Sequence, residues 1–553
     1  MRYLAVCLGI LVGCLAGCQT PVLNSLEFPQ GPERSLVRVD GRHLVGASVI
    51  WDAGLPAEQT IPGGFLGAYM FSVPPGVTPG NHPVALRNSH GTSPTQNYLV
   101  TAPQPFGPPR IDRVTLVGSD FSTPGMVSPL LYVQGANFDV GSVVQVQGSD
   151  VATASHKGLR TNLYGSNVTI LGYPIYHYLS LIALPGLLSA GATIQVQVRN
   201  LDGTTSNSFN YVLPATAAQL DSDGDALLDD WENNGYDANN DGTLEVDLPA
   251  LGSDPFRPDI YVEVDVMQGL ANPPIASTAT TPGVFEASQQ MFAAAPVLNP
   301  LTDPGIRLTI DSSGSIANTP TLHFGTIIPS NGTSTDFATI RNANFTAARD
   351  DIYHYSIWGD ALVGGFSGVS DVDFGGSEVG DDFLVSFDNF SNSFQTLRSQ
   401  VETFVHELGH DLSLRHGGIT HRRFNPQYWS AMSYTWQLRS GSNNATRRNR
   451  VTCAPVYWAD TTATEPNGAP PANPNAIIDY SHGMGPTIVE NNNSLQEPTG
   501  VCGFPVDWNN NGNTTDTNLS VNANDEGGAA ETLVDVSNWA GLRFNGPADD
   551  GGL

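Results

Sequence analysis

One short stretch, residues 406–418, constrains the fold more than any other part of the chain. It begins His-Glu-Leu-Gly-His and carries a further histidine near its end. Helical residues four apart lie above one another on one face, so a helix here brings the imidazoles of His406 and His410 together. His416 can join them if the helix ends after Leu412 and the chain doubles back. The stretch therefore predicts a helix that ends abruptly beside three clustered histidines.

These residues form the H-E-x-x-H pattern, in which two histidines hold zinc and the glutamate acts on a water at the metal. A catalytic zinc uses three protein ligands and keeps a fourth position open. We therefore expect His406, His410 and His416 to be zinc ligands and Glu407 to be the general base. For a bare H-E-x-x-H pattern, the alternative is a pair of solvated histidines on a helix surface. The third histidine favours zinc.

A methionine follows this motif, in the segment Ser-Ala-Met-Ser-Tyr at residues 430–434. Together the two motifs resemble the metzincin family of zinc endopeptidases, which combine a long H-E-x-x-H-x-x-G-x-x-H motif with a methionine turn. The resemblance implies that Met432 forms the floor of the zinc site. It also implies that Tyr434 ligates zinc or stabilises the reaction intermediate. One position departs from the family, because its glycine is Ser413 here, and a serine adopts the left-handed turn only at some cost.

The amino terminus has the features of a bacterial lipoprotein. Arg2 and the apolar run at residues 4–16 predict a signal peptide over residues 1–18. The segment ends in Leu-Ala-Gly-Cys and resembles the lipobox, which implies acylation of Cys18 and a lipid anchor. Since residue 19 is not aspartate, the resemblance implies an outer-membrane lipoprotein that faces the periplasm or the cell surface. The alternative is an ordinary signal peptide with an incidental cysteine.

Cysteine content and charge agree with a protein outside the cytoplasm. Cys453 and Cys502 remain in the body of the mature chain, and we expect a disulfide between them in an oxidising compartment. The net charge is −30, from 53 acidic and 23 basic residues. Such a surface argues against nucleic acid as a partner, because phosphates need basic patches. It suits a secreted protein that binds calcium.

The first part of the chain is predicted to consist of two β-sandwiches. Residues 19–105 contain short alternating runs broken by proline and glycine, which is typical of a small sandwich. Residues 106–215 repeat turn residues at matching offsets, which indicates a tandem module. Both resemble the immunoglobulin-like IPT/TIG domains of surface proteins. Such modules bind a surface partner or act as a stalk.

Residues 216–253 form an acidic linker with a predicted calcium loop. Positions one, three, five, nine and twelve of this loop carry carboxylates, which fits the oxygen-rich shell of calcium. The residues are Asp221, Asp223, Asp225, Asp229 and Glu232. The loop departs from the EF-hand at Ala226, and its D-x-D-G-D core resembles thrombospondin type 3-like repeats as well. The alternative is a solvated acidic linker.

Residues 254–553 are predicted to form the catalytic domain, with a loop-rich carboxy-terminal part. Expected strands at 258–265 and 306–310 flank an expected helix at 282–295, and this alternation predicts α/β layers. The metzincin resemblance implies that a strand at 382–387 is the edge that pairs with extended substrate. The predicted fold is thus multidomain, with two immunoglobulin-like β-sandwich modules followed by an α/β (α+β) metzincin-like zinc protease domain.

These features predict a zinc-dependent endopeptidase that hydrolyses peptide bonds of extracellular proteins. Zn²⁺ and Glu407 would activate water, and Ca²⁺ would be a second cofactor. Its partners would be a protein or peptide substrate and a membrane reached through the lipid at Cys18. One alternative is a calcium-stabilised surface adhesin or binding protein with an inactive metalloprotease-like domain. Another is zinc-dependent hydrolysis of a non-peptide substrate.

Overall fold

Two units make up the chain, residues 1–223 and residues 224–553, and each is described by itself. The structure is a computed structural model, and it describes most of residues 19–544. The residues left out within that range are 28–29, 32–35, 45, 67, 75, 101–107, 140, 159–168, 171–172, 175–177, 296, 302–303, 372–379, 389, 391–395, 419–421, 438–441, 452–477, 482, 484, 502–504 and 529. No helix in the described part is long and apolar enough to cross a membrane.

The first half of unit 1 has two sheets around one hydrophobic core. The core is centred on the fully buried rings of Trp51, Phe71 and Tyr98. One sheet has the order β1 (Val22–Glu27), β3 (Leu36–Arg42), β7 (Ala68–Ser72), β6 (Gly63–Leu66). The other has the order β2 (Gln30–Gly31), β10 (Gln96–Val100), β8 (Gly80–Asn88), β4 (Ser48–Trp51), β5 (Gln59–Ile61), with β9 (Gly91–Thr92) paired to β8.

The second half of unit 1 has its own core and its own sheets. Ile194, Val196 and Val198 alternate along one strand and all point into this core, as expected for a half-buried strand. One sheet has the order β11 (Arg110–Asp120), β12 (Met126–Ala136), β18 (Tyr178–Leu184), β15 (Ala152–Gly158), with β19 (Leu188–Ser189) on β12. The other has the order β14 (Ser149–Asp150), β13 (Val143–Val146), β20 (Thr193–Arg199), β21 (Phe209–Val212). These mostly antiparallel sheets are compatible with β-sandwich modules. A hairpin of β16 (Thr169–Ile170) and β17 (Tyr173–Pro174) and the short helix η2 (Ala217–Gln219) complete the unit.

Unit 2 is built on a mixed sheet. Its order is β23 (Arg307–Asp311), β22 (Asp259–Met267), β27 (Tyr353–Gly359), β30 (Asp382–Ser386), β29 (Gly368–Ser370), with β24 (Ser315–Ile316) on β22. The pairs are parallel except that β29 runs antiparallel to β30. Ile260, Val262 and Val264 belong to the core on one face, and Tyr261 belongs to the core on the other. The sheet is therefore covered on both faces.

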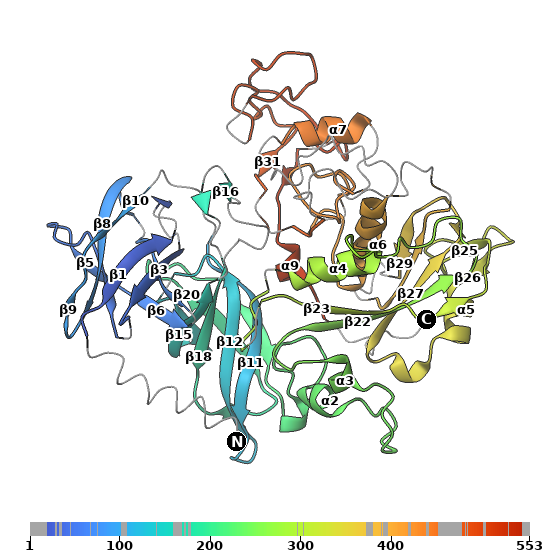
Figure 1. Cartoon of the computed structure of the whole chain (residues 1–553). Helices are drawn as coiled ribbons and strands as arrows, with labels where there is room; N and C mark the ends of the chain where they lie inside the picture. The colour runs from blue at the N-terminus through green and yellow to red at the C-terminus, as the bar shows by residue number, and fades with distance from the viewer. Residues whose placement is uncertain are drawn as a thin grey trace. The chain divides into compact units, whose positions relative to one another are not determined.

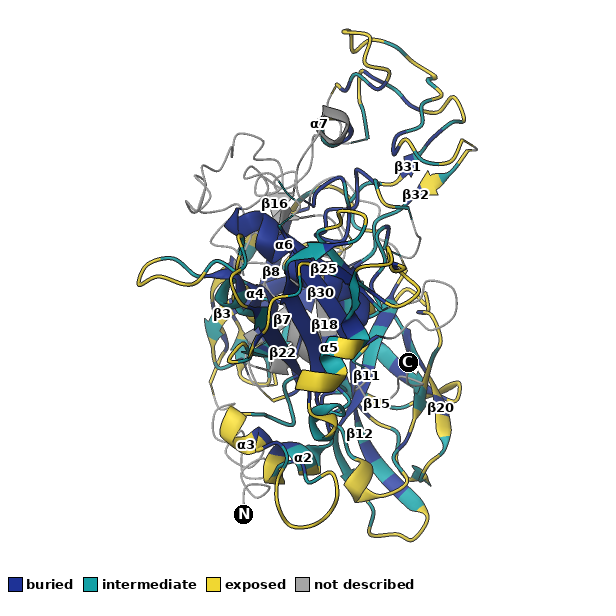
Figure 2. Ribbon diagram, turned by 90° about the vertical axis from the view of Figure 1, so that its right-hand side faces the viewer, coloured by how far each residue is buried: buried dark blue, intermediate teal, exposed yellow. Residues whose placement is uncertain are grey.

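Helices α4 (Val284–Ala293) and α6 (Leu397–Asp411) share the core of one face and lie next to each other (Figure 1). Every residue of α6 is buried, as the dark blue of α6 in Figure 2 shows. The expected helix at 282–295 and strands at 258–265 and 306–310 are confirmed as α4, β22 and β23. The strand expected at 382–387 is present as β30, but its expected position at the edge of the sheet was wrong. β30 is paired on both sides, and β29 is the edge strand.

The other face and the periphery of unit 2 carry shorter elements. Phe337 of α5 (Phe337–Asn344) packs into the core on the face opposite α6. The remaining elements of unit 2 are α2 (Asp229–Asn234), α3 (Leu248–Leu251), β25 (Thr321–His323), β26 (Thr335–Asp336), α5 (Phe337–Asn344), η3 (Ala347–Arg349), β28 (Ala361–Leu362), α7 (Ser442–Asn449), β31 (Ile488–Val489), β32 (Thr532–Leu533) and α9 (Asn538–Gly541).

Candidate metal centre

Local hydrogen bonds fix where helix α6 begins and where it ends. The Thr396 side chain accepts a hydrogen bond from the Ser399 amide at 3.1 Å and so caps the amino terminus. At the other end, Ser413 has a φ of 69°. Its amide donates to the His410 carbonyl at 2.7 Å, and the Leu414 amide donates to the Gly409 carbonyl at 2.8 Å. This is a Schellman arrangement, and it turns the chain back towards the helix.

The reversal brings the three predicted zinc ligands together. Nε2 of His410 lies 3.1 Å from Nε2 of His406 and 3.2 Å from Nε2 of His416. Zinc–nitrogen bonds of about 2.0–2.1 Å in a tetrahedral site place two nitrogens roughly 3.3 Å apart. The spacing of the imidazoles therefore fits one small ion bound by all three rings.

Hydrogen bonding fixes which ring nitrogen is protonated in two of these histidines. Nδ1 of His406 lies 2.9 Å from the Ala431 carbonyl, and Nδ1 of His410 lies 2.8 Å from the Leu414 carbonyl. A carbonyl only accepts, so both Nδ1 atoms donate, and in the neutral rings both Nε2 atoms carry lone pairs. Two buried lone pairs that face each other at 3.1 Å repel unless a cation lies between them. The cluster is thus suited to bind a metal ion.

Glu407 lies beside the histidine cluster in a water-poor setting. Its side chain is buried, and burial raises its pKa to about 8. Gly368 of β29 packs directly against it, since a Cβ at this glycine would lie 2.5 Å from Oε1 of Glu407. The carboxyl group is therefore held between α6 and the edge strand β29, where a bound cation would favour its charged form.

The segment around Met432 forms a turn beneath α6. The Ser433 amide donates to the Ser430 carbonyl at 3.0 Å, and Met432 is fully buried. A Cβ at Gly409 would lie 2.5 Å from Sδ of Met432, so helix and methionine are in close contact. The Ala431 carbonyl in this turn is the acceptor that orients His406. The turn therefore supports the histidine cluster both by packing and by a hydrogen bond.

Tyr434 lies beside two of the histidines. Its ring centroid is 4.6 Å from that of His416 and 5.6 Å from that of His406, with the second pair stacked. Burial, with the nearby charge of Glu407, raises the Tyr434 pKa to about 12, so the phenol stays protonated at neutral pH. It is therefore a hydrogen-bond donor at the cluster.

The acidic loop at residues 221–232 also gathers its carboxylates. Oxygens of Asp221, Asp223 and Asp225 lie within 4.8 Å of one another, and those of Asp225, Glu232 and Asp259 form a second such group. Ala226 adopts a φ of 72°, the left-handed turn for which glycine was expected. The predicted ligand Asp229 belongs to neither group among the described residues, and helix α2 begins there.

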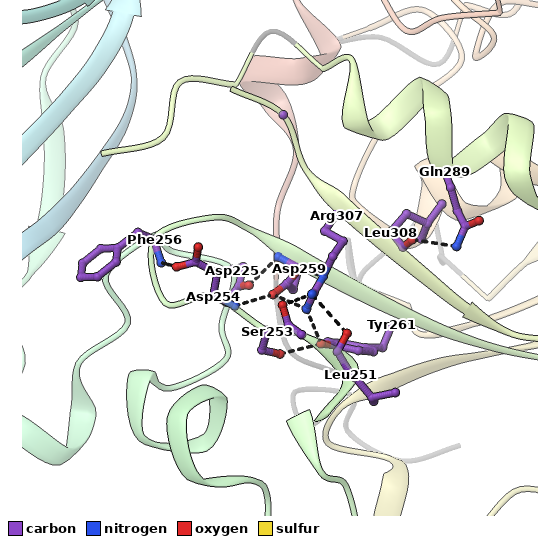
Figure 3. A network of polar contacts seen from close by, with 12 residues as sticks. Asp225, Leu251, Ser253, Asp254, Phe256, Asp259, Tyr261, Gln289, Arg307 and Leu308 are labelled. Atoms are coloured by element: carbon purple, nitrogen blue, oxygen red, sulfur yellow. Dashed lines mark hydrogen bonds and ion pairs between the residues drawn. The ribbon is translucent and has the colours of Figure 1, made fainter. Parts of the chain in front are cut away.

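Asp259 was not predicted from the sequence. Its amide donates to Asp225 Oδ2 at 2.6 Å, which joins β22 to the acidic loop (Figure 3). Its own carboxylate accepts from Arg307 at 2.6 and 2.9 Å. Burial raises the Asp259 pKa to about 6, although Arg307 opposes the shift. Acidic and histidine groups that can bind a metal thus occur at separate places in the chain.

Three predicted site residues fall outside the described part of the chain. They are Cys18, which is predicted to be acylated, and Cys453 and Cys502, which are predicted to form a disulfide.

Comparison with known proteins gives no family for this chain. No family model matches it, and no curated protein does. Among solved structures, one described with a xylogluco-oligosaccharide shares 17% identity over 35% of this chain and 41% of that chain, with a TM-score of 0.13. SGBP-B from a xyloglucan utilization locus in Bacteroides uniformis shares 16% over 35% and 49%, with a TM-score of 0.13. The gamma-CGTase of Alkalophilic bacillus clarkii shares 13% over 36% and 26%, with a TM-score of 0.14. The matched part spans less than half of each of these three chains.

These comparisons correct the function predicted from the sequence. None of the three structures is described as a peptidase, and two of the descriptions name xyloglucan or its oligosaccharide. The prediction of a zinc-dependent endopeptidase acting on extracellular proteins is therefore wrong as the main function. The alternative expected from the sequence, a calcium-stabilised surface adhesin or binding protein with an inactive metalloprotease-like domain, is not contradicted by them.

Proposed function

We propose that this chain is a calcium-stabilised surface-binding protein whose second unit carries a zinc centre with hydrolytic chemistry. The observation that carries the zinc centre is the pair of Nε2 lone pairs of His406 and His410, which face each other at 3.1 Å. Nε2 of His416 lies 3.2 Å from that of His410 and completes a three-nitrogen face. Nitrogen ligands of this kind suit zinc, whereas calcium and magnesium prefer oxygen.

The surroundings of the three histidines support a finer fold proposal for unit 2. A buried methionine turn lies under α6, and an antiparallel edge strand, β29, lies beside Glu407. Both features resemble the metzincin arrangement expected from the motifs. We include in the proposal that unit 2 is a metzincin-like α/β domain.

The residues around the cluster define the chemistry proposed for it. Zinc, when bound, would lower the pKa of a water and polarise a substrate carbonyl or related group. Glu407 would accept the proton of that water and pass it to the leaving group. Tyr434 would donate a hydrogen bond to the negative charge that develops on the substrate. The edge strand and α6 would exclude bulk water from this carboxylate.

The calcium part of the proposal rests on the acidic loop. Asp225 and Glu232 are buried carboxylates, and their oxygens lie within 4.8 Å of an oxygen of Asp259. Buried carboxylates at this spacing repel one another, and a calcium ion bound by several carboxylates removes the repulsion. Asp221 and Asp223 would complete the oxygen shell.

Metal analysis tests the zinc centre directly. Purified protein should contain one zinc per chain, and His410→Ala and His416→Ala should each lose it. His90→Ala, which removes an exposed histidine of unit 1, is the matched control and should keep the metal. Equal zinc in the His410→Ala variant and the parent protein would refute the centre.

Hydrolysis is tested with probes that do not assume a natural substrate. A p-nitrophenyl ester reports water activation, and casein reports peptide-bond cleavage. Glu407→Gln should keep zinc and lose nearly all turnover of any accepted probe, whereas Tyr434→Phe should lose roughly 10- to 1000-fold. If zinc-loaded protein turned over no probe at all, the hydrolytic part of the proposal would be wrong, and a binding protein with an inactive centre would remain.

The binding part is tested on glycan and protein arrays with and without calcium. Retention that depends on calcium supports the proposal, and retention on neither array contradicts it. The lipid anchor at Cys18 and location in the bacterial envelope stay predictions. Labelling with palmitate, and its loss in Cys18→Ala, checks the anchor.

A further inference from the structure

Two arginines and a glutamate form a largely buried polar group beside the amino-terminal half of α6. Arg398, Glu402 and His406 follow one another at intervals of four residues, so they lie along one face of this helix. The helical rise places Glu402 about 6 Å and Arg398 about 12 Å before His406 along the axis. The polar group therefore begins one helical turn away from the histidine cluster.

Arg398 is the most deeply buried cation of this group. Its side chain is 7% exposed and forms an ion pair with Glu402, in which Nε lies 2.7 Å from Oε1. Its terminal nitrogens, Nη1 and Nη2, are buried and have no hydrogen-bond partner among the described residues. Buried N–H groups without an acceptor cost free energy, and a guanidinium presents its N–H groups as a planar fork. The terminal nitrogens of Arg398 are thus available to an oxygen acceptor.

Arg448, on α7, reaches the same group. Its Nη1 donates to the Thr435 carbonyl at 2.9 Å, whereas its buried Nε has no hydrogen-bond partner in the described structure. Burial lowers the Arg448 pKa, the charge of Glu402 opposes this shift, and the charge of Arg398 adds to it. Glu402 is the carboxylate that both arginines share. One carboxylate does not balance two guanidinium groups, and an incompletely balanced charge in a buried place is costly.

Thr435 connects the arginines to the histidine cluster. It directly follows Tyr434, whose ring stacks on His406 with a centroid distance of 5.6 Å. Arg448 is only partly buried, whereas Arg398 is almost completely buried. The arginine pair therefore joins a partly exposed position to the buried face of α6 that carries His406.

We propose that Arg398 and Arg448 bind an oxyanion, which is a carboxylate, sulfate or phosphate group. A guanidinium fork matches two oxygens of such a group, and these charge-assisted hydrogen bonds are stronger than neutral ones. The terminal nitrogens of Arg398 and Nε of Arg448 are the donors. The oxyanion is either a free anion or the charged end of a ligand held at the histidines, and the second case rests on the zinc centre proposed above. Such a ligand carries its negative charge about 6–12 Å from the histidines.

Sulfate binding tests the site itself. Equilibrium dialysis of radioactive sulfate is carried out on the full chain with zinc and calcium present and the ionic strength fixed. The parent protein should bind one sulfate per chain, and Arg398→Gln/Arg448→Gln should bind it about 10- to 100-fold more weakly because charge-assisted hydrogen bonds are lost. Arg42→Gln, at an exposed position of unit 1, is the matched control and should bind as the parent does. Absence of bound sulfate in the parent, or equal binding by the parent and the double variant, overturns the proposal.

Glu402→Gln should change the affinity in the opposite direction, which a misfolded variant cannot imitate. The substitution removes the carboxylate that competes for both arginines, so sulfate should bind about 10-fold more tightly than in the parent. Circular dichroism checks that the variant is folded. Unchanged or weaker sulfate binding in the folded variant contradicts the proposal.

Paired esters distinguish a free anion from the charged end of a larger ligand. Mono-p-nitrophenyl esters of dicarboxylic acids, from glutarate to suberate, are compared with p-nitrophenyl esters of uncharged fatty acids of the same length. If the charged end belongs to a ligand at the histidines, the parent prefers a charged ester, and Arg398→Gln/Arg448→Gln removes this preference. Sulfate binding without any such preference assigns the site to a free anion. The dialysis result depends neither on zinc nor on turnover, so failure of the hydrolytic function and failure of the oxyanion site are distinguishable.

Discussion

Gly368 of the edge strand β29 lies so close to Glu407 of helix α6 that a Cβ at this glycine would lie 2.5 Å from Oε1 and 2.7 Å from Cγ. This close contact fixes the position of the Glu407 carboxyl group between β29 and α6. We predict that Gly368→Ala displaces Glu407 and lowers hydrolysis by about 100-fold, since a shift of about 1 Å in a reacting group costs that much. Zinc content should not change.

Steady-state turnover of the ester probe and zinc analysis check this prediction together. Gly118→Ala is the matched control, because it adds the same methyl group to a strand where nothing lies within 4 Å. Normal turnover in Gly368→Ala would show that Glu407 does not need this contact.

Gly409 and Met432 are in similarly close contact. A Cβ at Gly409 would lie 2.5 Å from Sδ of Met432 and 2.9 Å from the Tyr480 hydroxyl. Alanine favours a helix over glycine by about 1 kcal/mol, but overpacking a buried site costs about 1–3 kcal/mol. We predict that Gly409→Ala lowers the free energy of unfolding by about 1 kcal/mol and weakens zinc retention.

Urea denaturation of a double-mutant cycle measures this coupling. Met432→Ala removes the clash, so the two substitutions together should destabilise less than the sum of their separate effects. Strict additivity would show that the methionine does not limit the space at Gly409.

Ser413 holds a left-handed conformation, with a φ of 69°, where α6 ends. This conformation costs a residue with a Cβ about 1–2 kcal/mol, whereas glycine adopts it freely but loses about 0.5–1 kcal/mol of flexibility on folding. We predict that Ser413→Gly raises the free energy of unfolding by about 0.5–1 kcal/mol. Ser413→Ala keeps the strain and should give no gain. Chemical denaturation distinguishes them, and equal stability of the two variants would mean that the turn is not strained.

The cluster of three histidines could be predicted from the sequence because its members are close in the chain. Helical periodicity places His406 above His410, and the position of His416 requires the helix to end early. The structure shows that ending at Ser413, which the motif comparison had marked as the unusual position. Local spacing therefore carried most of the information about this site.

The partners from distant segments could not be predicted in this way. Gly368 contacts Glu407 because β29 is the edge strand, whereas the strand at 382–387 had been expected at the edge. Asp259 joins Asp225 at the start of β22, and Asp371 meets Asp382 through the β29–β30 register. Pairing between strands sets these contacts, and no short motif encodes it. Within the acidic loop, the numbering of a twelve-residue template included Asp229, whereas the structure groups Asp225 with Glu232 and Asp259.

The last prediction concerns alkaline stability of unit 1. Tyr69 is buried, its hydroxyl donates to the Ala47 carbonyl, and burial raises its pKa to about 12. In the unfolded chain a tyrosine loses its proton near pH 10. The unfolded state therefore releases the proton first, so this contribution to stability is complete below about pH 10 and is lost as the pH rises towards about 12.

Tyr69→Phe removes this titration together with the hydrogen bond. The variant should be less stable than the parent by about 1 kcal/mol at pH 8, because the Ala47 carbonyl loses its donor. The difference should shrink and then reverse between pH 10 and pH 12, since a shift of about 2 pKa units corresponds to about 2–3 kcal/mol. Chemical denaturation of unit 1 at several pH values measures the difference directly. A constant difference across this range would mean that Tyr69 ionises as readily in the folded protein as in the unfolded chain.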